Sequence, residues 1–166
     1  MTPAALVAAH AISILAALGL ALVAWRWKNV GRLLLVALLL WAGQLNLRLA
    51  IQTPQVYTNY AEWAWAPYRR FILGSFAAQI TPLVAAIAVG QLAVAVLIAL
   101  RGRAVYVGLG GAIVFFVAIA PLGVGSAFPS TLLLALAAAL LLGARYPETL
   151  PAALWHALAP RQKVRP

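Results

Sequence analysis

The chain has 166 residues, of which 66% are hydrophobic and only 8% are charged, and its mean hydropathy is +1.00. Soluble domains of this length do not have such a composition, so the lipid bilayer is expected to be the solvent of the protein. The formal net charge of +10 resembles that of nucleic-acid-binding proteins. Most of the basic residues, however, flank apolar runs, as residues that set membrane topology do, and this argues against nucleic acid as a partner. These residues are Arg26, Lys28, Arg32, Arg101, Arg103, Arg145, Arg161, Lys163 and Arg165.

Several apolar runs approach the roughly 20 helical residues needed to cross about 30 Å of hydrocarbon. Because so little charge separates them, we expect one domain over residues 1–166, an all-α polytopic transmembrane bundle. The predicted spans are residues 3–25, 33–52, 82–100, 105–124 and 130–144, and the predicted interfacial helices are residues 54–66 and 150–159. The sequence contains no cysteine, which excludes disulfides and thiolate metal sites within the chain.

The first predicted span has its basic residues after it and none before it. A secretory signal peptide has the opposite order, so this helix is expected to remain in the mature protein. A stripe of small residues, which lets another helix approach closely, recurs every four positions along it at Ala5, Ala9, Ser13, Ala17 and Ala21. His10 lies beside the stripe. We expect it to make a local hydrogen bond or to face the headgroups, and we predict no metal site.

The second predicted span carries polar residues in its second half, where an arginine costs about 2.5–3.5 kcal/mol at mid-bilayer. Gln44 and Arg48 are four residues apart and therefore share one helical face. Asn46 points about 200° away from Gln44 and must find its own partner or reach the headgroups. Two interpretations of Arg48 stay open: its side chain snorkels to the nearby membrane surface, or it pairs within the bundle.

The segment after this span is the most aromatic part of the chain, with Tyr57, Tyr60, Trp63 and Trp65. Thr53 and Pro54 are typical of a helix start, and Pro67 is predicted to end that helix. One interpretation is an aromatic belt at headgroup depth. The other is a cap over an outward-facing pocket, with Glu62 turned toward the bundle. The two interpretations are compatible.

The third predicted span contains Gln91 near its centre, where a buried amide needs a hydrogen-bonding partner from another helix. The fourth is expected to kink at Pro121, because proline removes a backbone donor and crowds the preceding turn. The sequence of the tail predicts a short helix that lies on an anionic membrane leaflet and is anchored by the basic residues Arg161, Lys163 and Arg165.

Orientation follows from the positions of the basic residues. With five spans and an outside N-terminus, the cytoplasmic segments hold three basic residues after the first span, two after the third and four in the tail. The outer segments hold only Arg69 and Arg70. This bias of nine against two predicts a cytoplasmic C-terminus.

Four polar residues are hypothesised to meet near the outer leaflet beneath the aromatic helix: Gln44, Arg48, Glu62 and Gln91. In this ligand-binding polar node, Gln44 is the expected contact of Gln91, and Glu62 is the partner of Arg48 if Arg48 pairs within the bundle. No catalytic residue is predicted. The carboxylates Glu62 and Glu148 fall in different compartments, and the chain has no nucleophile–base set.

Three segments within residues 33–142 resemble the DoxX-like family of small bacterial membrane proteins: NLRLAIQTPQVYTNYAEWAWAPYRR, PLVAAIAVGQLAVAVLIALRGR and APLGVGSAFPSTLLLALAAALLL. The resemblance implies a four-helix membrane bundle in the bacterial inner membrane, with an early arginine, to which Arg48 corresponds, and an aromatic loop. Residues 3–25 are then an additional leading helix. Gly90-Gln91-Leu92 has glutamine where the family commonly has an acidic residue.

Two functional classes stay open. The first is a binding or accessory protein, which holds a lipid- or quinone-like ligand near the outer leaflet or attaches to a larger membrane complex. The second is a membrane-embedded, oxidoreductase-linked enzyme or a small transporter that acts on such a ligand. No cofactor is predicted beyond a lipid or quinone. The expected partners are membrane lipids and, through the small-residue helix faces, another protein or a second copy of the chain.

Overall fold

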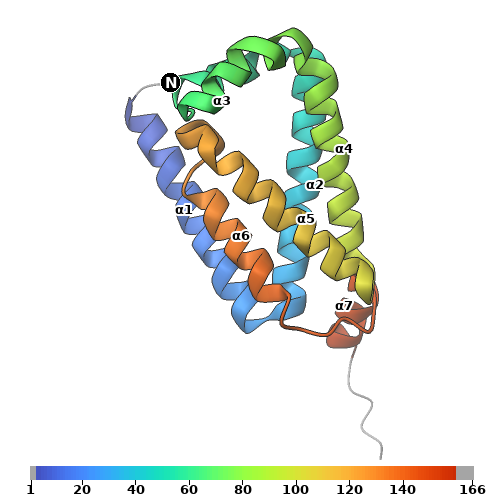
Figure 1. Ribbon diagram of the computed structural model, residues 1–166. Helices are drawn as coiled ribbons and strands as arrows, with labels where there is room; N and C mark the ends of the chain where they lie inside the picture. Colours follow the sequence, from blue (N-terminus) through green and yellow to red (C-terminus); the bar gives the residue numbers. More distant parts are fainter. Residues whose placement is uncertain (1–2, 160–166) are drawn as a thin grey trace, which may run out of the picture.

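The computed structural model describes residues 3–159, which are almost entirely helical and contain no strand. Four longer helices and the shorter α6 lie along the bundle, and further short helical segments cover its two ends (Figure 1). The longer helices are α1 (Pro3–Arg26), α2 (Lys28–Gln52), α4 (Ile80–Ala99) and α5 (Arg103–Ile119), and α6 comprises Ser130–Leu141. The predicted all-helical class is confirmed.

Within residues 3–159, four helical stretches are long and apolar enough to cross a membrane: Ala4–Arg26, Lys28–Gln52, Ala66–Ala99 and Arg103–Ser126. These fit the predicted multi-pass membrane protein. Helix α6 is apolar but has only 12 residues, which at 1.5 Å per residue gives about 18 Å. It is therefore shorter than a full crossing of about 30 Å, and a fifth span stays a prediction.

The helices pack around two apolar clusters. The larger cluster fills the half of the bundle nearer α7 (Leu150–Leu158) and includes Leu35, Leu39, Ile98, Leu109 and Leu141. The smaller cluster lies at the opposite end and consists of Ala50, Tyr57, Ile80 and Val84. Helix α2 packs mainly against α4, whereas α6 packs between α1 and α5.

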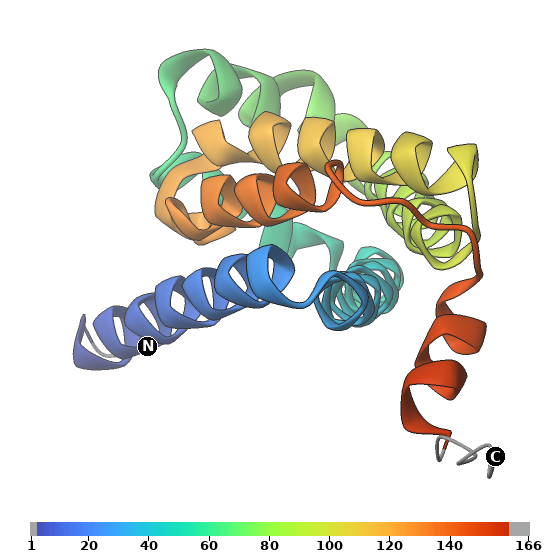
Figure 2. The ribbon, with the colours of Figure 1, turned by 90° about the horizontal axis from the view of Figure 1, so that it is seen from below.

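Helix α1 is only partly integrated into the bundle. Its C-terminal half is packed through Ala17, Leu20, Ala21 and Ala24. Its N-terminal half diverges from the other helices and leaves residues 4–9 exposed (Figure 2). The predicted small-residue stripe is thus used for packing at Ala17 and Ala21, while the part toward the N-terminus faces outward.

The aromatic segment forms a cap of several short elements, whereas the sequence predicts one helix over residues 54–66. The cap consists of the 3-10 helix η1 (Pro54–Glu62), α3 (Ala66–Phe71), the π-helical turn η2 (Ile72–Phe76) and the 3-10 turn η3 (Ala77–Gln79). Pro67 lies in the first turn of α3, so it begins a helix instead of ending one. Proline fits there because backbone N–H groups in the first turn of a helix have no acceptor within the helix, so no hydrogen bond is lost with the N–H that proline lacks.

Pro121 also acts as a boundary. Helix α5 ends at Ile119, and the 3-10 helix η4 (Ala120–Ser126) continues the chain, in place of a kink within one long helix. At the other end of the molecule, α7 follows an extended segment. The basic tail residues Arg161, Lys163 and Arg165 lie outside the described residues.

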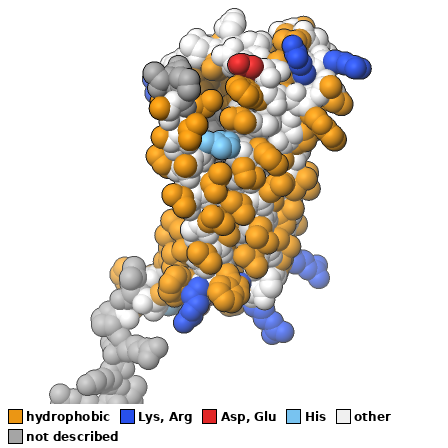
Figure 3. Space-filling model, turned by 90° about the vertical axis from the view of Figure 1, so that its left-hand side faces the viewer, with side chains coloured by type: hydrophobic (Ala, Val, Ile, Leu, Met, Phe, Trp, Pro, Cys, Tyr) orange, Lys and Arg blue, Asp and Glu red, His pale blue; other side chains and the backbone are white. Residues whose placement is uncertain are grey.

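The surface has the charge distribution of a membrane protein. On the face shown in Figure 3, Lys and Arg side chains gather near the two ends, and hydrophobic side chains cover the band between them. Exposed large hydrophobic residues in this protein include Val7, Ile12, Leu15 and Leu22 of α1. An apolar belt of this kind suits contact with lipid chains.

Candidate functional site

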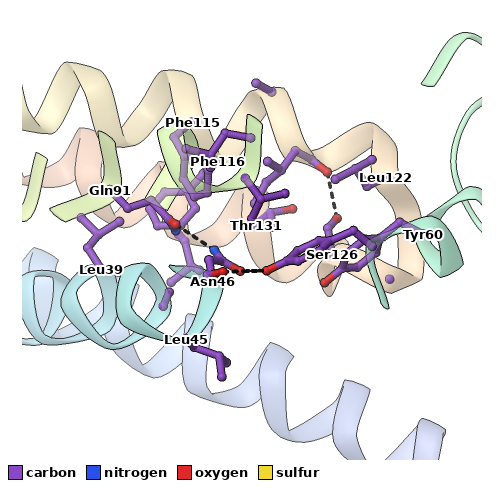
Figure 4. A pocket seen from close by; sticks show the side chains of 18 of the residues that line it. Leu39, Leu45, Asn46, Tyr60, Gln91, Phe115, Phe116, Leu122, Ser126 and Thr131 are labelled. Carbon is purple, nitrogen blue, oxygen red and sulfur yellow. Dashed lines mark hydrogen bonds between the residues drawn. The ribbon is translucent and has the colours of Figure 1, made fainter. Parts of the chain in front are cut away.

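A pocket of about 580 Å³ lies in the capped half of the bundle, between α2, α4, α5 and α6 and beneath the cap (Figure 4). Its wall contains eight aromatic residues: Trp41, Tyr57, Tyr60, Tyr68, Phe71, Phe76, Phe115 and Phe116. Aliphatic residues such as Leu39, Leu45 and Val84 fill most of the remaining wall. The volume and the apolar lining are those of a small-molecule binding site.

A chain of hydrogen bonds crosses one side of this pocket. The Tyr57 hydroxyl donates to Asn46 Oδ1 at 2.9 Å, and Asn46 Nδ2 donates to Gln91 Oε1 at 2.8 Å. The three residues come from η1, α2 and α4. Gln91 is 4% exposed, and a buried amide without a partner is costly, so this contact ties α2 to α4. The predicted need of Gln91 for a partner on another helix is therefore met by Asn46.

The predicted polar node is arranged differently. Gln44 and Arg48 are exposed on α2, and Arg48 Nε donates to Gln52 Oε1 at 3.0 Å within the same helix. Glu62 is exposed as well. Gln91 is the member of the node that lines the pocket, and it contacts Asn46 instead of Gln44. The reason is rotational: the face of α2 that turns toward α4 carries Asn46, and Gln44 lies on the opposite face.

The structure does not pair Arg48 with Glu62, the partner considered for it within the bundle. Among residues 3–159, the ion pair that the structure shows joins His156 to Glu148, at 3.0 Å. Because η1 is a 3-10 helix, residues three apart share a face, which turns Tyr57 and Tyr60 inward and Glu62 away from them. The position of Arg48 matches the alternative interpretation, in which its side chain reaches the surface.

The four predicted cap aromatics divide into two pairs. Tyr57 and Tyr60 line the pocket, with their ring centroids 5.8 Å apart. Trp63 and Trp65 are 50% and 72% exposed and face outward. The first pair suits the cap interpretation and the second suits an interfacial belt, so the segment combines the two.

The cap is fastened to η4 and to the last turn of α5, through contacts that the sequence does not predict. The backbone N–H of Trp65 donates to the Pro121 carbonyl at 2.9 Å, and the Tyr68 hydroxyl donates to the Ala118 carbonyl at 2.9 Å. Two glycines permit this approach. A Cβ on Gly123, whose φ is +70°, would collide with the Trp63 carbonyl, and a Cβ on Gly125 would collide with the Tyr60 ring.

Burial raises the pKa of both pocket tyrosines. Desolvation, followed by the nearby Tyr60, raises the pKa of Tyr57 to about 12. Desolvation also raises the pKa of Tyr60 above its ordinary value. Both hydroxyl groups are uncharged at neutral pH, as tyrosine hydroxyls ordinarily are, and burial keeps them uncharged to higher pH.

The remaining polar atoms of the pocket are few. Thr131 is 3% exposed, and its hydroxyl has no hydrogen-bond partner among the described residues. Ser126 Oγ donates to the Ile119 carbonyl at 2.8 Å. No Asp, Glu, Lys, Arg or His is among the described residues that line the pocket, and residues 3–159 contain no cluster of three or more His, Asp or Glu suited to a metal ion. The arrangement can bind an apolar molecule and orient a polar group on it.

A second polar cluster, centred on Arg32, lies near α7. The position of Arg32 beside an apolar run is typical of a topology signal, yet the residue is 1% exposed. Its Nε donates to the Ile98 carbonyl at 2.6 Å, its Nη2 to the Leu100 carbonyl, and its guanidinium lies 4.9 Å from the Tyr146 ring centroid. These carbonyls at the end of α4 lack helical partners, and a cation there also meets the negative end of the helix dipole. The cluster is a structural clamp on α4.

Comparisons with known proteins return no match: no protein-family model, no curated protein and no solved structure is similar to the chain. The resemblance to the DoxX-like family therefore stays a prediction.

Proposed function

We propose that the protein is a small integral membrane protein of the binding type, which holds a lipid- or quinone-like ligand in the aromatic-capped pocket. The observation that carries the proposal is the pocket of about 580 Å³ with its aromatic wall and its short line of polar groups at Tyr57, Asn46 and Gln91. Such a combination of apolar area and a few directional groups is typical of ligand sites.

The pocket is also accessible from the apolar surface. Trp41 and Leu45 line it and are 63% and 39% exposed, and Phe71 and Ile87 line it and are 51% and 44% exposed. A hydrophobic ligand can therefore enter from the lipid phase. With the N-terminus outside, as the charge bias predicts, the pocket lies in the outer half of a bacterial inner membrane. In the DoxX-like reading, α1 is the additional leading helix beside a four-helix core.

The experiment is to purify the protein in mild detergent and to identify retained lipid-like molecules by mass spectrometry. Ala42 lines the pocket, so Ala42→Phe should fill part of it and lower the retained amount. Ala16→Phe introduces the same side chain on the exposed face of α1 and should leave retention unchanged. Equal retention by both variants, or no retention by the unmodified protein, would contradict the proposal.

A second candidate is attachment to a larger membrane complex, which the exposed N-terminal half of α1 favours. In the candidate span that contains it, only 11% of the 18-residue window is buried within the protein, a smaller share than in the other three candidate spans. Ala9 belongs to the small-residue stripe and is exposed, so a partner helix can approach there. Co-purification of a stoichiometric protein that Ala9→Trp removes, but Leu22→Trp does not, would support this candidate. Absence of such a protein under the same conditions would count against it.

A further inference from the structure

The hydrogen bonds in the pocket wall run in one direction. Tyr57 is the donor at the start, and its hydroxyl also lies 3.3 Å from the Asn46 backbone carbonyl, which can only accept. Asn46 accepts from Tyr57 and donates to Gln91. The side-chain oxygens of both amides are thus engaged as acceptors. The group left at the end of the chain is the amide nitrogen of Gln91, which can only donate.

Other polar groups of the wall are also without a hydrogen-bond partner among the described residues, and the hydroxyl groups of Thr131 and Tyr60 can each donate as well as accept. The Thr131 hydroxyl is buried without a partner, and Thr131 lines the same pocket as Gln91 (Figure 4). An orphaned buried hydroxyl costs about 1–3 kcal/mol, so its presence in the wall calls for a partner. No charged side chain lines the pocket among the described residues, so a charged ligand group would remain uncompensated there.

We propose that the pocket selects an uncharged apolar molecule with a carbonyl oxygen, which accepts a hydrogen bond from the Gln91 amide nitrogen, with the Thr131 hydroxyl as a second donor in the wall. The inference rests on the proposed function and adds the chemistry of the ligand. Two sources supply such an oxygen in a membrane: the ester carbonyl of a lipid and the ring carbonyl of an alkylated quinone. An alkyl carboxylate and an alkylamine are excluded because their charge has no partner in the pocket.

The test uses the full chain in a neutral detergent and five probes that differ in the polar group. Methyl oleate supplies an ester carbonyl, an alkylated benzoquinone supplies a ring carbonyl, octadecene supplies no acceptor, and oleate and oleylamine supply opposite charges. Binding is measured by native mass spectrometry or by the shift in melting temperature. We expect both carbonyl probes to bind more tightly than the other three. The tighter carbonyl probe identifies the source.

Variants then assign the hydrogen bonds. Gln91→Leu should weaken binding of the carbonyl probes roughly two- to tenfold, the effect of one hydrogen bond, and should leave octadecene unchanged. Gln91→Leu also leaves the Asn46 amide without its hydrogen-bond acceptor. The double variant Asn46→Leu/Gln91→Leu is therefore tested as well, because both partners are then apolar.

Thr131→Val and Ser130→Ala form a matched pair. Both remove a buried hydroxyl that has no partner among the described residues, but Thr131 is among the residues that line the pocket and Ser130 is not. Thr131→Val should weaken binding of the carbonyl probes without loss of thermal stability, whereas Ser130→Ala should leave binding unchanged. A purely structural role for Thr131 predicts the same result for both variants.

Two results would overturn the inference. One is tight binding of oleate or oleylamine, equal to that of methyl oleate. The other is an equal effect of Gln91→Leu on methyl oleate and on octadecene. Either result leaves the proposed function intact as long as Ala42→Phe still displaces the bound probe. If no probe binds and Ala42→Phe has no effect, the proposed function itself fails.

Discussion

The Nε of Arg32 donates to the carbonyl oxygen of Ile98 at 2.6 Å, across 66 positions of sequence. The contact joins the first turns of α2 to the last turn of α4 and replaces the helical partners that the Ile98 and Leu100 carbonyls lack. Hydrogen bonds to charged groups contribute about 1.5–3 kcal/mol each.

Arg32→Leu is therefore expected to destabilise the protein by about 3 kcal/mol, since it leaves those carbonyls without a donor. Thermal unfolding in detergent measures the effect. The control is Arg26→Leu, because Arg26 is exposed and a surface change of this kind stays within about 0.5 kcal/mol. Similar melting temperatures for the two variants would refute the clamp.

Gly125→Ala should displace the Tyr60 ring, because the added Cβ would overlap it. Overpacking of this kind costs about 1–3 kcal/mol, and here it also loosens the cap over the pocket. We expect a lower melting temperature and less retained ligand. Gly110→Ala is the matched control, since no neighbouring atom lies within 4 Å of its Cβ position. Retention that falls equally in both variants would argue against a specific role of the cap.

Arg48→Ala and Glu62→Gln are expected to act independently. Both side chains are exposed, and Arg48 bonds to Gln52 in its own helix. A double-mutant cycle scored by thermal stability should give a coupling energy below about 0.5 kcal/mol, the ordinary error of additivity. A coupling of 1 kcal/mol or more, about twice that error, would show that the two side chains interact.

The stability of the protein should fall at alkaline pH through Tyr57. Its pKa is raised to about 12 in the folded protein, from about 10 in an unfolded chain. The folded state thus holds the proton more tightly, and the associated stability is complete below pH 10 and is lost as the pH rises from about 10 to 12. Chemical unfolding at a series of pH values measures the fall.

Tyr57→Phe should make that fall smaller but should not abolish it. The pKa of Tyr146 is also raised to about 12, chiefly by burial, and it contributes over the same range of pH. An identical pH dependence in the variant would show that Tyr57 does not titrate differently in the folded and unfolded states.

The predicted orientation is tested by reporter fusions. A reporter active only in the cytoplasm should work when fused after Pro166, because nine basic residues against two favour a cytoplasmic C-terminus with five spans. A reporter inserted at residue 64, in the cap, should instead be active on the outer side. Strong activity of a periplasmic reporter fused after Pro166 would reject the five-span model, in which α6 is the fifth crossing of the membrane.

Composition and local pattern determined the class of this protein. A chain that is 66% hydrophobic can expose its side chains only to lipid, and the basic residues and prolines mark where its helices begin and end. The sequence also showed that an amide at Gln91 needs a partner, because that requirement follows from burial alone. These properties depend on short stretches of chain, so they can be read without a fold.

The tertiary structure decided which residues distant in sequence become hydrogen-bond partners. Asn46 and Gln91 are 45 positions apart, and the rotation of α2 against α4 brings Asn46 to Gln91 and leaves Gln44 outside. The same rotation explains the two arginines of α2. Arg32 is buried because the C-terminal end of α4 supplies the carbonyls of Ile98 and Leu100 to it, whereas Arg48 faces outward. Hydropathy predicts the same free-energy cost of membrane insertion for both arginines. Only the packing of the helices determines which arginine finds hydrogen-bond acceptors within the bundle.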